Sequence, residues 1–196
     1  MTGKTIMGID PGTNTTGYGI LRIEGSVLQC VVLGDIDLHR IGDPYRKLRH
    51  IFERVCALIE AYEPDEVALE SPFFGENVQS MLKLGRAQGV AMAAALSRGL
   101  PVSEYAPRRI KQAITGQGSA SKEQVASILQ RLLRLAELPR KLDATDGLAV
   151  AVCHYFQSSV SPEMGTPDRK KALGGGPSGG KSWEKFIAEN PDRIKK

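Results

Sequence analysis

Two acidic residues end short apolar segments that are typical of β-strands. Asp10 ends the segment 4–10 and is followed at once by Pro-Gly, while Glu70 ends the segment 66–70 after Val-Ala-Leu. A carboxylate at a strand end lies at the rim of a sheet, where a substrate can reach it. An acid there is costly to bury unless it is paired, exposed or bound to a cation. Taken alone, Asp10 could equally be a turn residue, which is common in Asp-Pro-Gly.

Asp143 and Asp146 form a second acidic pair, and their spacing places them on one face of a helix near its N-terminus. One could be an N-cap and the other a favourable first-turn charge. Together with the two strand-end acids they make an oxygen ligand set without His or Cys, which suits Mg²⁺ or Mn²⁺. Two such ions can activate a water and stabilise the leaving oxygen in phosphodiester hydrolysis. The four acids therefore predict a magnesium-dependent phosphodiesterase centre.

Basic and aromatic residues in the same chain are typical of nucleic-acid binding. Residues 83–141 hold 11 Lys/Arg against 3 Asp/Glu, an excess that suits a polyanion, although it could also be a solvated surface. Phe73 and Phe74 follow the strand-end glutamate, and either ring could stack on an exposed base or cover the core. The candidates for phosphate contact are Arg108, Arg109, Lys111 and Lys122.

The elements that must position these side chains follow from the apolar pattern. A two-residue hairpin signal at Gly25-Ser26 and helical periodicity from Leu48 to Tyr62 are the clearest local features. Ser121 and Gln124 have the spacing of a capping box at the start of a helix. The predicted strands are 4–10, 17–24, 27–37, 66–70 and 101–105, and further helices are predicted at 77–98, 107–114 and 143–156. This order predicts an α/β, ribonuclease H-like fold, with a five-stranded mixed sheet (three antiparallel strands, then parallel ones) flanked by helices.

Small residues recur at four-residue steps in the predicted helix 77–98. Gly85, Gly89 and Ala93 would form a flat stripe that permits close approach of another element, either the sheet or a second subunit. The stripe is thus a candidate contact surface inside the domain or between two copies.

Composition separates a folded domain from a tail. After Gln157 the sequence becomes rich in Ser, Pro, Gly and Lys, so we expect a domain over 1–157 and a disordered tail over 158–196. No apolar run approaches the length of a membrane span and no secretory signal is evident, which predicts a cytosolic protein. The three cysteines are far apart and their spacing does not indicate zinc.

Several segments carry a resemblance to a known family. They are Gly8-Ile-Asp-Pro-Gly-Thr-Asn-Thr-Thr-Gly-Tyr-Gly19, Ala68-Leu-Glu-Ser-Pro-Phe-Phe74, Leu82-Lys-Leu-Gly-Arg-Ala-Gln-Gly-Val90, Glu104-Tyr-Ala-Pro-Arg-Arg-Ile-Lys-Gln112, Gly116-Gln-Gly-Ser-Ala-Ser-Lys122 and Asp143-Ala-Thr-Asp-Gly-Leu-Ala149. In this order they resemble the RuvC family of bacterial crossover-junction (Holliday junction) endodeoxyribonucleases, over about residues 4–156. The tail lies beyond the resemblance.

The resemblance implies a homodimer that binds four-way junction DNA in recombination and repair and nicks two strands of like polarity symmetrically. It implies a Mg²⁺-dependent centre, with two ions per site and Mn²⁺ as a substitute, and a branch-migration helicase complex (RuvA and RuvB) as partner. The family's catalytic acids fall on Asp10, Glu70, Asp143 and Asp146, its base-contacting aromatic on Phe73 and its phosphate-contacting lysines on Lys111 and Lys122. Some members carry His where this chain keeps Asp143.

Two other classes of function fit parts of the pattern. An ATP-binding, kinase-like protein of the wider fold group also places an Asp-Gly loop after its first strand, but it needs a second phosphate loop, usually in a duplicated domain. A non-catalytic nucleic-acid-binding factor on the same scaffold could keep Asp10 and lose the other acids. The short chain disfavours the first alternative, and the complete set of four acids disfavours the second.

Overall fold

A computed structural model describes residues 3–72, 77–139 and 143–159. The predictions for Phe73, Phe74 and the tail from residue 160 onward fall outside the described residues. Within the described ranges, no helix combines the length and the apolar character that crossing a membrane requires.

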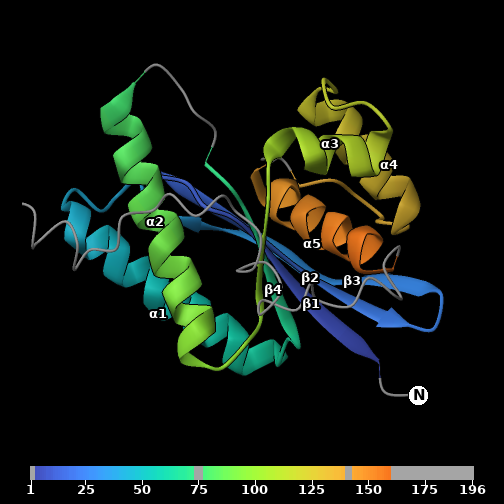
Figure 1. The fold of residues 1–196 in the computed structure, drawn as a ribbon, viewed down its shortest axis with the longest axis horizontal. Coiled ribbons are helices and arrows are strands. Elements are labelled where there is room, and N and C mark those ends of the chain that lie inside the picture. The colour runs from blue at the N-terminus through green and yellow to red at the C-terminus, as the bar shows by residue number, and fades with distance from the viewer. Residues whose placement is uncertain (1–2, 73–76, 140–142, 160–196) are drawn as a thin grey trace, which may run out of the picture. The chain divides into compact units, whose positions relative to one another are not determined.

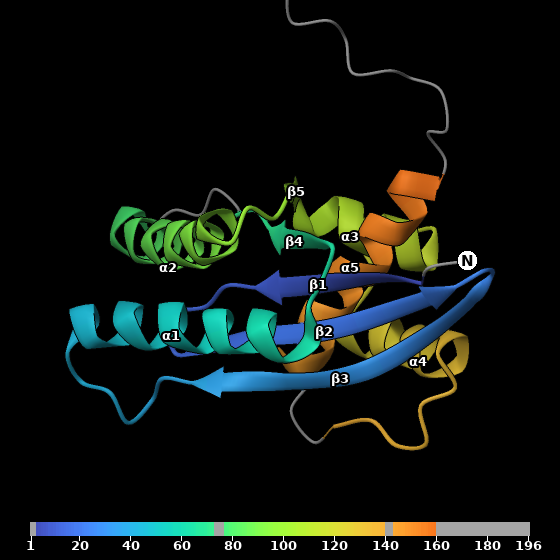
Figure 2. The same ribbon diagram turned by 90° about the horizontal axis from the view of Figure 1, so that it is seen from below.

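The five predicted strands are all present, in one mixed sheet. They are β1 Lys4–Asp10, β2 Thr15–Glu24, β3 Val27–Asp37, β4 Glu66–Glu70 and β5 Val102–Tyr105. The sheet order is β3-β2-β1-β4-β5, which Figure 2 shows edge to edge. The first three strands are antiparallel, whereas β4 and β5 add in parallel. Gly25 takes φ +62° in the two-residue turn of the β2–β3 hairpin, a conformation that glycine adopts without strain.

The helices cover the two faces of this sheet. Helices α1 Pro44–Tyr62 and α2 Val78–Ser97 lie on one face, and α3 Pro107–Thr115, α4 Lys122–Leu132 and α5 Asp143–Ser159 lie on the other (Figure 1). Each face buries its own apolar cluster, so the sheet is the middle layer of three. The ribonuclease H-like arrangement predicted from the order of elements is confirmed.

The small-residue stripe of α2 does not face the sheet. The helix buries Ala87, Ala91 and Ala94 instead. A Cβ built on Gly85 or Gly89 would meet nothing within 4 Å. Contact between this stripe and the sheet, one of the two predicted uses, is therefore wrong. The other use, contact with a second subunit, stays a prediction.

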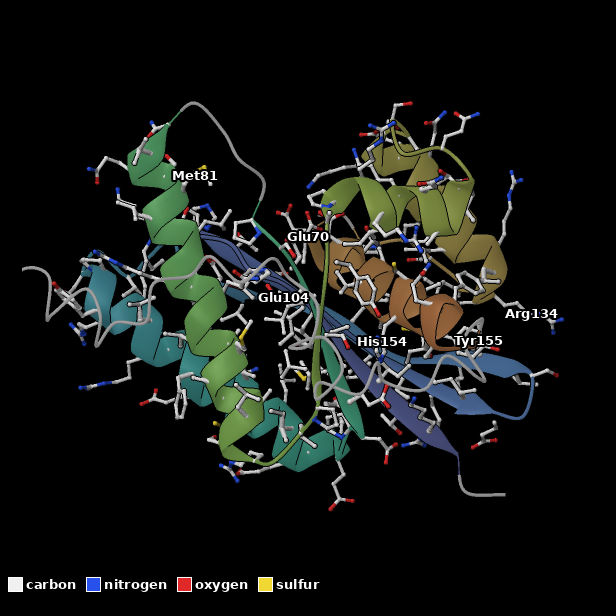
Figure 3. The ribbon with its side chains drawn as sticks, in the orientation of Figure 1. Glu70, Met81, Glu104, Arg134, His154 and Tyr155 are labelled. Carbon is white, nitrogen blue, oxygen red and sulfur yellow. The ribbon has the colours of Figure 1, made fainter. Side chains whose placement is uncertain are left out.

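A polar cluster joins α5 to the sheet at the starting end of β4. The imidazole of His154 lies between two partners: Tyr105 Oη is 2.7 Å from Nδ1, and Glu66 Oε2 is 2.5 Å from Nε2. Lys4 Nζ lies 2.8 Å from the other oxygen of Glu66. We call Lys4, Glu66, Tyr105 and His154 the histidine cluster; Figure 3 labels His154 within it. Because these residues come from β1, β4, β5 and α5, the cluster holds the helix to three strands.

Candidate active site

Two carboxylates meet at the rim of the sheet because β1 and β4 are parallel neighbours. Ile9 pairs with Leu69, so Asp10 and Glu70 follow at corresponding ends of the two strands. Both side chains are partly buried rather than free in solvent. The prediction that these acids share one edge of the sheet is confirmed.

The second acidic pair reaches this edge because α5 lies directly on the backbone of β2. A Cβ on Gly17 would come within 2.0 Å of the carbonyl oxygen of Asp143, and a Cβ on Gly147 within 2.4 Å of the Cα of Tyr18. Any side chain at either glycine would push the helix away from the sheet. The first turn of α5, which carries Asp143 and Asp146, is thereby set beside the end of β1.

Lys122 supplies a positive charge to this acidic group. Its Nζ lies 2.6 Å from Asp146 Oδ2 and 3.6 Å from Asp143 Oδ1. Lys122 is the first residue of α4, and the predicted capping box of Ser121 and Gln124 fixes that position: each side chain bonds the backbone N–H of the other residue.

A hollow of about 80 Å³ brings three of the four predicted acids together with two lysines, while Asp143 lies outside its lining. Lys111, from the basic helix α3, also lines it. Its full lining is Asp10, Glu70, Pro107, Ile110, Lys111, Lys122, Val125, Asp146 and Ala149. We call this hollow the acid pocket. The apolar side of this pocket, which Ile110 and Val125 form, could not be predicted. Nothing in the sequence distinguishes these two residues from ordinary core residues.

The acids of this pocket carry more negative charge than their surroundings balance. Burial and the nearby carboxylate of Asp146 raise the pKa of Asp10 to about 7. Burial, then the charges of Asp10 and Asp146, raise the pKa of Glu70 to about 8. Burial also raises the pKa of Asp146, even though its contact with Lys122 acts in the opposite direction. A cation among these oxygens would relieve both the repulsion and the cost of burial.

The carboxylates lie near one another, but their oxygens are not arranged to contact a single metal ion together. Among the described residues, no three carboxylate, His or Cys side chains stand in position to hold one metal ion. The ammonium group of Lys122 contacts both Asp143 and Asp146, so these two carboxylates already share one positive charge. The chemistry of the donors, all carboxylate oxygens, nevertheless fits Mg²⁺.

The two predicted arginines lie apart from the acids. Arg109 donates to the side chain of Gln157, three turns beyond Asp146 on α5 and so about 16 Å along the helix axis. The side chain of Arg108 packs beside Gly118, where an added Cβ would meet its Cγ at 2.5 Å. Of the four basic candidates, the structure thus brings Lys111 and Lys122 to the acid pocket, while Arg108 and Arg109 lie outside its lining.

A buried glutamine supports the strand that carries Glu70. Gln88 Nε2 on α2 lies 2.5 Å from Glu104 Oε1 and 3.5 Å from the backbone oxygen of Glu70. These contacts join α2 to the ends of β4 and β5. Gln88 could not be predicted as a supporting residue, because a single glutamine in a helix has no sequence feature that distinguishes a buried hydrogen-bonding role from an exposed one.

The fold and the acid pocket together define a class: a nuclease of the ribonuclease H-like fold. A family model described as "Crossover junction endodeoxyribonuclease RuvC" matches residues 6–154. The chain belongs to this family. Relatives that carry the same description are 57% identical in Bacteroides fragilis, over 98% of this chain and 96% of theirs, and 53% identical in Porphyromonas gingivalis, over 98% and 97%.

Solved structures agree with the family. Thermus thermophilus RuvC superposes with a TM-score of 0.72 at 31% identity, covering 80% of this chain and 96% of that one. A second structure, of Thermus thermophilus RuvC in complex with Holliday junction substrate, gives the same TM-score at 29% identity and the same coverage. This membership favours the nuclease over the ATP-binding and non-catalytic alternatives.

Proposed function

We propose that this protein resolves four-way DNA junctions in recombination and repair by metal-dependent hydrolysis of two phosphodiester bonds. The observation that carries the proposal is the convergence of acids from β1, β4 and α5 on one pocket that two lysines also line. The binding of a Holliday junction by the Thermus thermophilus relative supports the choice of substrate. Chromosomal DNA as substrate would place the reaction in the cytoplasm.

Four acids would hold the metal: Asp10, Glu70, Asp143 and Asp146. When bound, Mg²⁺, as two ions or with Mn²⁺ in its place, would activate the attacking water and stabilise the leaving oxygen. Deprotonation of Asp10 and Glu70, whose pKa values are raised to about 7 and about 8, would precede binding. Lys122 would give up its contact with Asp146, which frees its ammonium group for the DNA backbone.

The remaining site residues are proposed to position DNA. Lys111 and Lys122 would contact phosphates next to the cut. Phe73 would stack on an exposed base at the junction, with Phe74 beside it. Arg108 and Arg109, farther along the same side of the sheet, would contact the backbone of an arm and contribute salt-dependent affinity with little sequence information.

A homodimer would place two acid pockets on one junction, and α2 offers the surface for it. Val78, Leu82 and Leu96 are 66%, 52% and 56% exposed, although they are large and apolar. With the small residues between them they form one seam of helical spacing, Val78, Leu82, Gly85, Gly89, Ala93 and Leu96. An exposed apolar seam of this length is typical of a protein interface. RuvA and RuvB, implied by the resemblance, remain proposed partners.

The domain division is likewise a proposal: residues 1–157 would carry the whole nuclease, and 158–196 would be a tail. The structure corrects the start of the predicted tail: Ser158 and Ser159 are the last residues of α5 and are helical.

Cleavage of a synthetic junction tests the proposal. We expect the wild-type protein with Mg²⁺ to nick a four-way junction at two symmetric positions and to leave the matching linear duplex intact. An Asp10→Asn variant should bind the junction and cut it at least about 10³-fold more slowly, because the loss of a metal ligand removes several kcal/mol of transition-state stabilisation. Equal cleavage by the two proteins would overturn the proposal.

A further inference from the structure

The acid pocket continues into other hollows along the rim of the sheet. A second hollow, of about 160 Å³, shares Asp10, Glu70 and Pro107 with it and extends to Leu84 and Gln88 on α2. A third hollow, of about 380 Å³, begins at the next residues of the chain. Gly12 in the third hollow follows Pro11 in the second, and Lys83 and Ala87 in the third adjoin Leu84 and Gln88 in the second. Asp10 and Glu70 thus line two of these hollows, and the third is lined by residues adjacent in sequence to those of the second.

The third hollow has a basic rim and an apolar floor. Leu38 and Ile51, both buried, form part of the floor. Lys47, Lys83 and Arg86 supply positive charge, and the lining contains no acidic side chain. We call it the flank pocket. An apolar floor under cationic groups suits a nucleotide, which presents a flat base and an anionic phosphate together.

The three basic residues differ in whether their charged groups already have partners within the protein. Lys47 Nζ donates to the carbonyl oxygen of Thr13 at 2.9 Å and to Asn14 Oδ1 at 3.0 Å, so it fixes the loop that follows Asp10. Lys83 and Arg86 are exposed and make no ion pair within the part of the chain that the structure describes. Their charges are therefore available to a ligand, whereas that of Lys47 shapes the pocket.

An aromatic ring stands at the opening of the flank pocket. Tyr45, one of the first residues of α1, is 74% exposed. A large aromatic side chain kept in solvent beside cationic groups is the arrangement by which proteins hold unpaired bases, since stacking accepts any base and the cations take the phosphate. The ring completes a nucleotide-sized site.

We propose that the flank pocket binds a nucleotide of the cut strand, a short distance beyond the scissile phosphate. Lys83 and Arg86 contact its backbone phosphate, and its base lies on the apolar floor against Tyr45. The strand then runs from Lys111 and Lys122 across the acids to Lys83 and Arg86 on α2. This inference rests on the proposed function, because it assigns a further part of the same substrate.

Salt dependence of junction binding tests the phosphate contacts. Fluorescence anisotropy with a labelled four-way junction in EDTA gives the Kd over a range of KCl concentrations. Lys83→Ala and Arg86→Ala should each lower the slope of log K against log salt by about 0.9, the value for one phosphate contact. Arg22→Ala is the matched control: Arg22 is exposed on β2 and pairs with Thr5, far from the end of β1, so its slope should equal that of wild type. Unchanged slopes in both test variants would overturn the proposal.

Tyr45 gives an independent measure of base stacking. Tyr45→Ala should weaken junction binding at least about fivefold, while Tyr45→Phe, which keeps the ring, should stay within twofold of wild type, in line with the usual energy of base–aromatic stacking. A parallel loss in both variants, or in neither, contradicts the stacking role. A free mononucleotide that binds through Lys83 with the same affinity whether or not the junction is bound would assign the pocket to a small ligand and overturn the DNA assignment.

Cleavage kinetics separate this proposal from the one on which it rests. The Lys83, Arg86 and Tyr45 variants should raise KM and keep kcat within about twofold, because none of these residues lines the acid pocket. Normal junction cleavage with unchanged binding in these variants removes the flank pocket and leaves the proposed function intact. If wild type and Asp10→Asn cut equally, the proposed function itself fails.

Discussion

One strand carries two glutamates whose surroundings are opposite. Glu66 and Glu70 begin and end β4, and because they are four residues apart they lie on the same face. Burial acts to raise the pKa of Glu66, but hydrogen bonds from Lys4 and His154 bring it below its ordinary value. Among the described residues no side chain donates a hydrogen bond to the Glu70 carboxylate, and burial with the charges of Asp10 and Asp146 raises its pKa to about 8, although Lys122 and Lys111 act to lower it. Figure 3 shows Glu70 and His154, the partner of Glu66, at separate levels along the sheet.

The two glutamates show where the protein neutralises a partly buried carboxylate with its own groups and where it does not. In the histidine cluster each oxygen of Glu66 has a cationic or polar partner, so that end of β4 is complete within the protein. In the acid pocket, Lys122 is the one ammonium group within salt-bridge distance of the acids among the described residues. A buried carboxylate that the protein does not neutralise is stabilised when a cation binds. Glu66 therefore stabilises the fold, whereas Glu70 is placed to bind a cation.

The largest expected effect separates the two glutamates by activity. Glu70→Gln should slow junction cleavage at saturating DNA by at least about 10³-fold, because an amide keeps the shape of the side chain and removes the charge that holds a cation. Glu66→Gln should stay within a few-fold of wild type. Single-turnover cleavage measures both rates. Similar losses in the two variants would remove the contrast.

The next effect separates them by stability. Glu66→Gln should lower the free energy of unfolding at pH 7 by about 2 kcal/mol, because the buried imidazole of His154 loses a charged acceptor. Since the pKa of Glu66 is lowered, its contribution is present above pH 4.5 and is lost as the pH falls through the folded-state value. Urea denaturation followed by circular dichroism at pH 7 and pH 3.5 should show a smaller difference from wild type at the lower pH.

A smaller effect of opposite sign is expected at Glu70 in metal-free protein. Because its pKa is raised from 4.5 to about 8, the folded chain keeps a proton that the unfolded chain releases, and stability falls as the pH rises between these values. Glu70→Gln removes this charge and should be more stable than wild type at pH 8.5, with little difference at pH 4. Thermal melts in EDTA at the two pH values test this, and a variant less stable than wild type at pH 8.5 would contradict the account.

The smallest effect concerns residues that belong to neither region. A chain ended after residue 160 keeps both glutamates, all four acids and the whole of α5. We expect its junction cleavage rate to lie within about twofold of that of the full chain, and its melting temperature to be nearly the same. A loss of folding on truncation would show that the proposed tail is part of the domain.

The fold could be predicted closely because its signals are local. The hairpin turn at Gly25, the alternating strands and the capping box at Ser121 each depend on residues near in sequence, and all are confirmed. The edge shared by Asp10 and Glu70 could also be predicted, since parallel strands align their ends. Apolar periodicity and turn residues carry this information without any distant contact.

What could not be predicted depends on contacts between distant segments. Nothing near Lys122 in the sequence indicates that its ammonium group contacts Asp146. Nothing near Arg109 indicates that it bonds Gln157 instead of facing the acids. The close contact of Gly17 with α5 was also hidden, because a glycine in a strand has several ordinary explanations. Such pairings are set by how the layers pack, which the local pattern does not contain.

The close seating of α5 has a consequence for how the protein opens. This helix touches all five strands, rests on the glycines of β2 at its start and is held by His154 near its end. Separating the helix from the sheet would break both its contact with the glycines of β2 and its contacts through His154. The amides of its buried central turns, from Leu148 to His154, should therefore exchange with solvent deuterium through global unfolding, at the slowest rate in the molecule. The amides of its first turn have no intrahelical acceptor and should exchange faster. The acids of its first turn are thus attached to one of the most persistent segments of the domain.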